Sequence, residues 1–534
     1  MKIKFYGASQ TVTGSCYIIE ANGRRFGVDC GLYQGNAETE KRNWRTAIYR
    51  PTEIDFFLIT HAHIDHSGLL PRMVKDGFKK RIYATKPTCD LLELMLQDSA
   101  HIQEMEAAWK NKKQNRQHSL GEAEPLYDTN DALACIPLFS QVEYNHPFEP
   151  CPGVTVTYHD AGHILGSAFI LLEVREKDQS TTLLFSGDLG RTGALLMNDH
   201  EVIQKTDYLF MEGTYGNRDH KDPESSLKEL TEAIKYSYAN KEKVIIPAFA
   251  VERTQEILYT LHLIMENGDL PEDMPIFLDS PLAISATEVF RRYPDYMDEA
   301  TNAKLAQGED PLKLPNLRMC RRSDDSRRIN EMQGPAIVIS ASGMCNAGRI
   351  KHHLRHNLWR KGASIVFVGF QAEGTPGRAI VDGAKHINML GEPIAVAAKI
   401  YTIGGFSAHA GQGQLLEWVK PLHGSDTCIF LTHGEKTALE TLADLLREHY
   451  NMKVVIPAYL DEYNIKAGKL AASPAGGLET KIVWPKIIAE LQSELAALSG
   501  LGNSLSARSM TRQRNLRDRL EAISKELKNI LSGE

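Results

Sequence analysis

Short apolar runs recur along the chain, and several of them end on a residue that can bind a metal ion. Runs such as "DFFLIT", "TTLLFSGD" and "TCIFLTHGE" predict buried strands, because β-branched, aromatic and aliphatic residues stand side by side in them. Sheet proteins place their sites just beyond the carboxyl ends of such strands. The polar residues at or just past these ends are Asp29, His61, His163, Asp188, Glu212 and His433.

A different pattern fills residues 213–385, where strand-like runs alternate with amphipathic helical stretches. One example is "KVIIPAFAVERTQEILYTLHLIMENG", and "PAIVISASGMCNAGRIKHHL" repeats it. This alternation predicts a largely parallel α/β domain. Because His433 resumes the strand-then-histidine pattern beyond it, we expect this domain to be inserted into another one. The expected divisions are 1–212 and 386–485 for the outer domain, 213–385 for the insertion, and 486–534 for a helical tail.

The tail has an apolar seam with helical spacing. Its apolar residues stand three or four positions apart, and "SGLGNS" separates two such runs. This predicts a helical hairpin. Packing on the rest of the chain or formation of a homodimer is the favoured interpretation, and contact with RNA through the basic stretch "SARSMTRQRNLRDR" is the alternative.

Composition narrows the class of protein. The 534 residues, of which 42% are hydrophobic and 24% charged, predict a soluble globular protein of two or three domains. No apolar run approaches the ~20 residues that cross a bilayer, and the amino terminus reads as a strand, so we expect no membrane association and a cytoplasmic location. A net charge of −7 argues against a uniformly basic surface, but a local basic groove can still bind a phosphate backbone. The eight cysteines form no CxxC pair, which disfavours a thiolate zinc site.

The stretch "THAHIDHSG" concentrates ligands in one short loop: His61, His63, Asp65 and His66. Imidazoles and carboxylates suit zinc, manganese or iron. One ion cannot use all four residues of so short a loop, whereas two ions ~3.5–4 Å apart can share them if a carboxylate bridges the pair. His163 and Asp188 supply further ligands. An isolated histidine would be an ordinary polar loop residue, but the order H-x-H-x-D-H favours a hydrolytic metal centre, with phosphodiester, thioester, lactam and phosphonate substrates all open.

Seven motifs in sequence order make a family resemblance specific. "THAHIDHSG" resembles the signature of the metallo-β-lactamase superfamily. "MEGTYGNR", "PAFAVERTQEIL", "SASGMCNAGRIKHHL", "GGFSAHAGQ" and "LTHGE", together with "GASQTVTGSCYIIE", resemble its β-CASP branch, the nucleases related to the endonuclease of pre-mRNA 3′-end processing and to bacterial and archaeal ribonucleases. The resemblance covers residues 1 to about 465 and implies an αββα sandwich with an inserted β-CASP α/β domain, followed by a C-terminal helical extension outside it.

The resemblance also implies residue roles and two zinc ions, with Mn²⁺ as the alternative. One zinc would be held by His61, His63 and His163. The other would be held by Asp65, His66 and His433. Asp188 would bridge them, and Asp29 would support the metal loop.

For proton transfer, the resemblance implies that His409 is a general acid oriented by Glu212. This agrees with the chemistry, because hydrolysis of a phosphodiester expels an alkoxide that needs a proton, and a histidine with a carboxylate partner can supply it. A helix-start histidine without a chemical role is the alternative interpretation of His409. Its loop, "GGFSAHAG", is built of small residues that let backbone approach a phosphate.

The resemblance favours RNA as the substrate, since a histidine at position 433 is typical of RNA-directed members. The function expected is therefore a zinc-dependent ribonuclease, endonucleolytic, with 5′-exonuclease action as an additional mode. The alternatives are a non-catalytic RNA-binding scaffold, a small-molecule metallo-hydrolase and a DNA-directed nuclease. The residues expected to contact RNA are Arg253, Ser342, Gly343, Arg349, Arg378 and Ser407.

Three positions depart from the family pattern. Gly213 stands where serine is usual, Gly411 where aspartate is common, and Ala347 where a second glycine is common. None of the three replaces a metal ligand, so we expect the activity to be retained.

Overall fold

The computed structural model describes residues 1–115, 123–202, 205–372, 374–466 and 469–472. The chain divides into two compact units, Met1–Ala475 and Gly476–Glu534. The expected helical tail, 486–534, lies outside the described residues. None of the helices in the described ranges combines the length and apolar character that a bilayer crossing requires.

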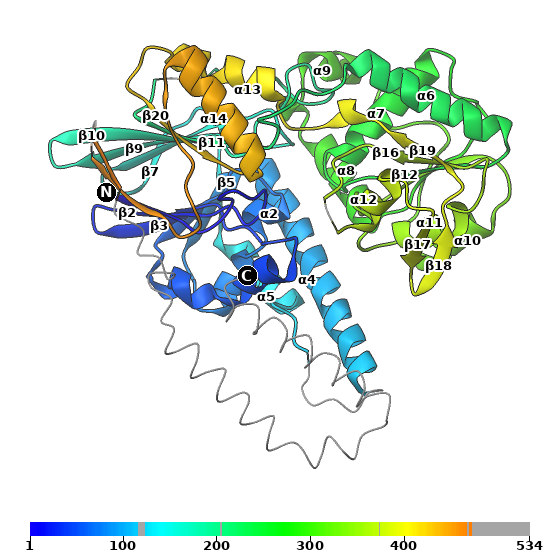
Figure 1. Cartoon of the computed structure of the whole chain (residues 1–534), viewed down its shortest axis with the longest axis horizontal. Coiled ribbons are helices and arrows are strands. Elements are labelled where there is room, and N and C mark those ends of the chain that lie inside the picture. Colours follow the sequence, from blue (N-terminus) through cyan, green and yellow to red (C-terminus); the bar gives the residue numbers. More distant parts are fainter. Residues whose placement is uncertain (116–122, 203–204, 373, 467–468, 473–534) are drawn as a thin grey trace, which may run out of the picture. The chain divides into compact units, whose positions relative to one another are not determined.

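Two sheets form the core of the outer domain (Figure 1). In strand order, the first sheet consists of β23 (Lys469–Ala472), β22 (Glu462–Lys466), β1 (Lys2–Phe5), β2 (Tyr17–Ala21), β3 (Arg24–Val28), β4 (Phe56–Leu58), β5 (Arg81–Thr85) and β6 (Phe139–Val142). The second consists of β21 (Lys453–Val455), β20 (Cys428–Thr432), β11 (Tyr208–Glu212), β10 (Gln179–Phe185), β9 (Ala168–Glu176), β8 (Val154–Asp160) and β7 (Phe148–Cys151). The runs that end on polar residues are therefore β3, β4, β8, β10, β11 and β20.

Alternating side chains explain how the sheets pack against each other. Tyr17 and Ile19 of β2 belong to an apolar cluster shared by both sheets, whereas Ile18 points to the opposite face and joins the cluster beneath the helices. The shared cluster is rich in aromatic rings. The rings of Phe185 and Phe210 stack at 4.3 Å, and those of Phe210 and Phe430 at 4.9 Å. This packing fixes the strand ends that carry the ligands.

Helices cover the outer faces of both sheets. The helices on the first sheet are α2 (Ile64–Ser67), α3 (Leu70–Lys75), α4 (Lys86–Asn115) and α5 (Thr129–Leu133). Those on the second are α13 (Gln412–Val419) and α14 (Lys436–Tyr450), whose Leu415 and Leu439 pack with Leu209 and Ile429 of the sheet. The predicted αββα sandwich is confirmed.

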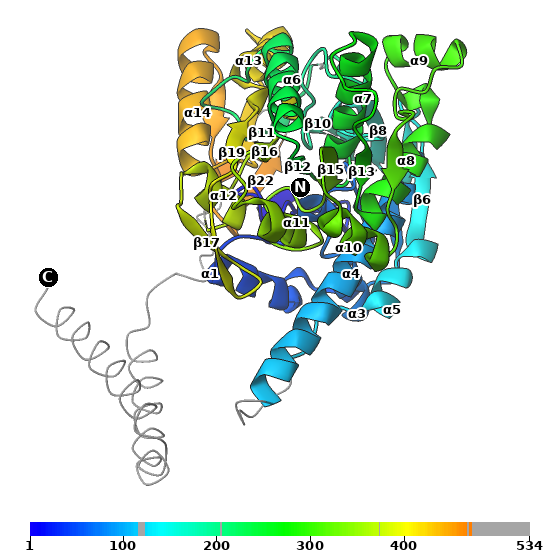
Figure 2. The ribbon, with the colours of Figure 1, turned by 90° about the vertical axis from the view of Figure 1, so that its right-hand side faces the viewer.

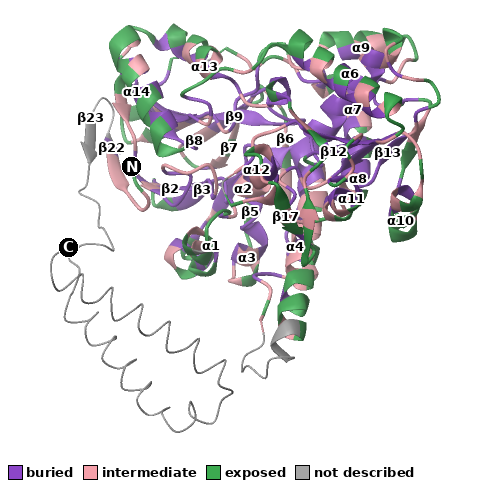
Figure 3. Ribbon diagram, turned by 45° about the vertical axis from the view of Figure 1, so that its right-hand side comes forward, coloured by how far each residue is buried: buried purple, intermediate pink, exposed green. Residues whose placement is uncertain are grey.

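The inserted domain contains a third sheet in which all strands are parallel. In strand order it consists of β14 (Leu317–Met319), β13 (Ile276–Leu278), β15 (Ala336–Ser340), β12 (Lys243–Pro247), β16 (Ser364–Phe367) and β19 (Lys399–Thr402). Figure 2 shows its helices beside these strands, among them α6 (Pro223–Ala239), α7 (Arg253–Glu266), α8 (Pro281–Arg292) and α11 (Ile350–Asn357). The central strands are buried, whereas the helices expose polar faces (Figure 3). The predicted parallel α/β insertion is confirmed.

Two local features differ from the sequence-based expectation. The sheet of the insertion extends to β19, past the expected boundary at residue 385, because "KIYT" pairs in parallel with β16 at the sheet edge. Loop 341–349 also separates β15 from α11, so Ser342 and Gly343 lie before the helix rather than at its amino terminus. The contact of these two residues with RNA stays a prediction.

Candidate metal centre

The ligand-rich loop follows β4 and enters helix α2, which begins at Ile64. Asp65 and His66 are thereby held in a helical turn. Backbone hydrogen bonds fix this turn, since Ser15 N donates to the Asp65 carbonyl (2.8 Å) and Cys30 N to the His66 carbonyl (2.7 Å). A Cβ on Gly31 would lie 1.7 Å from the Asp65 oxygen, so only glycine permits this close approach.

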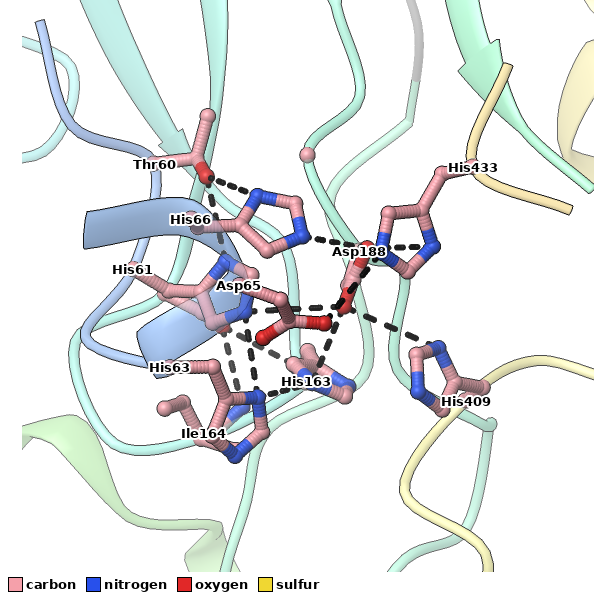
Figure 4. Close-up of polar contacts among 12 residues, drawn as sticks. Thr60, His61, His63, Asp65, His66, His163, Ile164, Asp188, His409 and His433 are labelled. Carbon is pink, nitrogen blue, oxygen red and sulfur yellow. Dashed lines mark hydrogen bonds and ion pairs between the residues drawn. The ribbon is translucent and has the colours of Figure 1, made fainter. Parts of the chain in front are cut away.

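Four ligand atoms converge on one point (Figure 4). His63 Nδ1 lies 3.1 Å from His61 Nε2 and 3.2 Å from His163 Nε2. Asp188 Oδ2 lies 3.5 Å from His61 Nε2 and 3.6 Å from His163 Nε2. A tetrahedral ion with ligands at ~2.0–2.2 Å requires ligand–ligand separations of about 3.3–3.6 Å. The four atoms therefore fit one tetrahedral divalent cation.

The other oxygen of Asp188 faces a second group. Asp188 Oδ1 lies 3.3 Å from His66 Nε2 and 3.4 Å from His433 Nδ1, and His433 Nε2 lies 3.5 Å from Asp65 Oδ2. Asp65, His66 and His433 can hold an ion together. In Figure 4 Asp188 stands between the two groups, as a bridging carboxylate requires.

Unpartnered polar atoms support the fit of a cation. Both carboxylate oxygens of Asp188, His66 Nε2 and His433 Nε2 are buried without a hydrogen-bond partner in the described part of the chain. Burying such atoms unsatisfied costs free energy, and coordination to a cation removes that cost. The donor set of imidazoles and carboxylates without thiolate is also the type expected at an open, catalytic site.

The electrostatics keep the ligands of the first group, His61, His63, His163 and Asp188, in their metal-binding forms. Burial lowers the pKa of His63 to about 4, and burial lowers the pKa of His61 and of His163 well below the ordinary value. Burial would raise the pKa of Asp188, but the surrounding histidines, His433 first, outweigh burial and hold it well below the ordinary value. These imidazoles are therefore neutral and this carboxylate is ionised near pH 7, as metal coordination requires.

Asp29 lies behind the ligands rather than among them. Its carboxylate accepts hydrogen bonds from Thr60 N (2.8 Å), from Thr60 Oγ1 (3.0 Å) and from His66 Nδ1 (2.7 Å). The bond to Nδ1 leaves His66 Nε2 directed at Asp188, so Asp29 selects the ring nitrogen available to a metal. Thr60 has no unusual sequence signature, and inspection of the sequence alone missed it.

His409 and Glu212 lie together at the rim of the centre. His409 Nδ1 is 3.1 Å from Glu212 Oε2 and 3.9 Å from Asp188 Oδ2. Thr214 Oγ1 and Leu189 N donate to the Glu212 carboxylate and fix it in place. Burial lowers the pKa of His409, but Glu212 and Asp188 outweigh burial and raise it to about 9. His409 is therefore cationic near pH 7.

The backbone around His409 is tied to the loop that carries Asp188. Gly190 and His409 form an isolated antiparallel bridge, Ala410 N donates to the Leu189 carbonyl (2.8 Å), and His220 Nε2 lies 2.9 Å from the His409 carbonyl oxygen. The positions of the Asp188 carboxylate and of His409 are therefore coupled through a few bonds. His220 was not singled out from the sequence, although it follows the "EGTYG" motif closely.

The arginines expected to contact RNA already have carboxylate partners. Arg253 Nη1 lies 2.7 Å from Glu256, Arg349 Nη1 lies 2.7 Å from Asp279, and Arg378 Nε lies 2.8 Å from Asp382. Their contact with RNA stays a prediction. Arg253, only 7% exposed, is the one whose position opposes it.

The small residues of the expected RNA contacts have local roles in the structure. Ser342 Oγ accepts a hydrogen bond from Asn346 N (3.2 Å), which orders loop 341–349, and Gly343 lies against the ring of Phe249. Ser407 is buried two residues before His409. The structure thus places Ser407 close to the metal centre, and Ser342 and Gly343 on a loop of the inserted sheet.

Two of the three departures from the family pattern have a structural explanation. A Cβ on Gly411 would lie 2.7 Å from Asp219 Oδ1, and this carboxylate oxygen accepts from Gly413 N (2.8 Å). Asp219 therefore caps α13 from another segment, in the place of a side chain at 411. A Cβ on Gly213 would lie 2.6 Å from the Leu439 side chain, so glycine allows α14 to approach β11. Nothing in the structure explains Ala347.

Three buried histidines make the first ligand group resistant to mild acid. We expect the ion held by His61, His63 and His163 to be retained at about pH 5.5, because an ordinary imidazole is mostly protonated there whereas these three imidazoles are neutral. Loss of this ion should begin only as the pH approaches the pKa of His63, about 4. Elemental analysis after dialysis at decreasing pH measures this. Loss of all metal near pH ~6.5, the ordinary histidine value, would contradict the expectation.

Comparison with known proteins agrees with this geometry. Three family models match the chain: a metallo-beta-lactamase superfamily domain over residues 18–205, a Beta-Casp domain over 254–380, and a Zn-dependent metallo-hydrolase RNA specificity domain over 393–457. Ribonuclease TTHA0252 of Thermus thermophilus is 34% identical over 84% of this chain and 96% of its own length. Transcription termination factor FttA of Methanocaldococcus jannaschii is 27% identical over 87% of this chain and 72% of its own, and that of Methanococcus maripaludis is 29% identical over the same shares. The chain therefore belongs to the β-CASP family of metallo-β-lactamase-type hydrolases.

Proposed function

We propose that this protein is a ribonuclease that hydrolyses RNA phosphodiester bonds with two zinc ions, Mn²⁺ being the alternative metal. Cleavage is endonucleolytic, and 5′-exonuclease action is an additional mode. The observation that carries the proposal is the pair of ligand groups sharing Asp188, with the His409–Glu212 pair beside them. The RNA specificity domain and the 34% identity to a protein named as a ribonuclease support RNA as the substrate.

The two ligand groups would each hold one divalent cation. Bound there, the cations would supply an activated water and neutralise charge on the reacting phosphate. The chain contributes orientation: Asp29 and Thr60 fix the ring of His66, and the backbone bonds of α2 fix Asp65. The buried site also strengthens each charge interaction, because few water dipoles compete with it.

His409 would deliver the proton that the leaving oxygen needs. Its Nδ1 is held by Glu212, which leaves Nε2 for the substrate, and its cationic state makes it a donor at neutral pH. Glu212 acts through His409 rather than on the substrate, because it is buried and its oxygens already accept from Leu189 N and Thr214.

A cleavage assay with defined substrates tests the proposal. Zinc-loaded full-length protein is incubated with single-stranded RNA labelled at its 5′ or its 3′ end, with 5′-phosphate and 5′-triphosphate forms compared, and with DNA of the same sequence as a control. Internal fragments from RNA alone support the endonuclease. Mononucleotide release from the 5′-phosphate form alone supports the exonuclease mode. Intact RNA with bound metal would favour a non-catalytic scaffold, and equal cleavage of DNA would overturn RNA specificity.

Homodimer formation is also proposed, on family resemblance and on the apolar seam expected in the tail. Sedimentation of the full-length protein tests it directly. A single monomeric species at micromolar concentration would contradict it.

A buried ion pair joins the loop that carries Asp188 to the inserted domain. Arg191, three residues after Asp188, donates to Glu256 of α7 and to the Gly405 carbonyl, and its N–H donates to the Ala408 carbonyl (3.2 Å). Both Arg191 and Glu256 are buried. Arg191 therefore links the inserted domain to the loop that carries His409.

Arg191→Met is expected to lower RNA cleavage while leaving the metal bound, because His409 loses a support but no ligand is removed. The free energy of unfolding should fall by about 3 kcal/mol, the low end for a broken buried pair, since Arg253 still neutralises Glu256. Denaturant titration and elemental analysis measure both. Arg327→Met, on an exposed helix face, is the matched control. Loss of metal in Arg191→Met, or cleavage equal to that of the control, would contradict this role.

A further inference from the structure

Two phenylalanines lie on the loops at the carboxyl ends of neighbouring strands in the inserted sheet. Phe249 follows β12, and Phe370 follows β16, which pairs with β12 in parallel. Phe249 is 40% exposed and Phe370 is half-buried. Loops at this edge of a parallel sheet are where ligands bind.

The ring of Phe249 is held in one place by its surroundings. A Cβ on Gly343 would lie 3.1 Å from two atoms of the ring, and a Cβ on Gly369 would lie 3.8 Å from it, so the ring rests against two glycines. The amide of Gln371 donates to the carbonyls of Gly343, Gly369 and Phe370 at 3.0–3.1 Å and so ties the loop that carries Phe370 to loop 341–349. Thr254 Oγ1 donates to the Phe249 carbonyl (2.7 Å). An exposed ring fixed in this way loses little entropy when a flat ligand stacks on it.

A series of side-chain contacts runs from Phe370 to the proposed proton donor, His409. The ring of Tyr215 lies 6.0 Å from the ring of His409, and the guanidinium of Arg218 lies 4.9 Å from the Tyr215 ring and 5.6 Å from the Phe370 ring. Arg218 is exposed, and no carboxylate within the described ranges forms an ion pair with it. It differs in this from Arg253, Arg349 and Arg378, which are all paired.

An exposed phenylalanine by itself is ordinary. Here the ring of Phe249 lies beside the loop that carries Phe370, and the Phe370 ring lies near the guanidinium of Arg218. Arg218 has no carboxylate partner among the described residues and is close to His409 through Tyr215. This combination fits single-stranded nucleotides, because their bases can stack on the rings while their phosphates bind the arginine. We propose that Phe249, Phe370 and Arg218 form a stacking platform for unpaired bases of the RNA next to the bond that is cut. The platform selects single-stranded RNA without reading base identity, because every base has a π-face. This inference rests on the proposed ribonuclease function.

The first test compares Phe249→Leu with Phe249→Trp in zinc-loaded full-length protein, using single-turnover cleavage of single-stranded RNA at increasing enzyme concentration. Leucine keeps the apolar contact with the glycines but removes the flat ring. We expect Phe249→Leu to raise the half-saturating concentration by about 5- to 150-fold, the range for one lost base stack, with little change in the maximal rate. Phe249→Trp should retain binding. Metal content and the unfolding midpoint serve as controls for both variants.

The second test uses RNAs in which one abasic nucleotide is moved through the positions flanking the cleaved bond. At one position the abasic substitution should weaken binding by the wild type as much as Phe249→Leu does, and should not weaken the variant further. Equal weakening of both proteins at every position, or wild-type binding by Phe249→Leu, would overturn the platform while leaving the ribonuclease intact. A wild type that neither binds nor cleaves any RNA would overturn the ribonuclease function, and the platform with it.

Discussion

Asp188→Ala is expected to abolish RNA cleavage and to empty both metal positions. Each oxygen of this carboxylate faces a different ligand group, at 3.5 Å from His61 Nε2 and at 3.3 Å from His66 Nε2. Removing it takes a ligand from both groups and leaves the histidines without their shared counter-charge. Because metal catalysis supplies several kcal/mol, cleavage should fall by about 10³-fold or more. Elemental analysis and single-turnover cleavage measure the two effects.

The matched control is Asp426→Ala, which removes a fully exposed carboxylate whose ion-pair partner is Lys453. It should keep both metals and full cleavage. Retention of two zincs by Asp188→Ala would contradict the bridging role, whereas loss of metal from the control would show that the effect is not specific to the site.

His409→Ala is expected to keep both metals and to reduce cleavage by about 10²–10⁴-fold, the usual range for a lost proton donor. The ring of His409 belongs to neither ligand group, although it lies close to both: its Nδ1 is 3.9 Å from Asp188 Oδ2, and its ring centroid is 4.5 Å from that of His163. Glu212→Gln should cause a smaller loss, and the double variant should be no worse than His409→Ala, because Glu212 acts through the histidine. His423→Ala, an exposed histidine near the end of α13, is the control. Near-normal cleavage by His409→Ala would remove this residue from the mechanism.

The pH profile gives an independent check on His409. Its pKa is raised to about 9 in the metal-free protein, so the donor form is present near pH 7 and is lost as the pH rises through that value. Bound cations repel the positive charge of protonated His409 and so lower its pKa. The alkaline limb of kcat/KM should therefore lie at or below about pH 9 in the wild type and be absent from His409→Ala. An unchanged alkaline limb in the variant would assign it to another group.

The sequence was most informative where the candidate ligands are close together along the chain. His61, His63, Asp65 and His66 stand in one loop, and their spacing alone indicated a metal centre. Asp188 and His433 lie far from this loop in the sequence, and the pattern of a strand followed by a ligand suggested them. This pattern was informative because β10 and β20 are parallel strands that end at the same edge of one sheet. The structure brings all these ligands together, and it also confirms the sandwich and the insertion.

Other features depended on contacts that leave no local signal. Thr60, His220 and Arg191 are ordinary residue types whose importance comes from a distant partner. Arg349 looked free for RNA because nothing in its motif reveals that Asp279 lies 2.7 Å away. The sequence also did not reveal that the sheet of the insertion extends past residue 385, because β19 is short and is recognised only by its pairing with β16. The exposed ring of Phe249 was likewise indistinguishable from a core phenylalanine in the sequence.

A crystal structure of the zinc-loaded protein, with anomalous diffraction measured at the zinc absorption edge, would show whether Asp188 joins two ions. We expect two peaks on opposite sides of Asp188, one at ~2.0–2.1 Å from nitrogens of His61, His63 and His163, and the other at that distance from His66 and His433. A single peak, or a second peak away from Asp188, would contradict a shared two-metal centre.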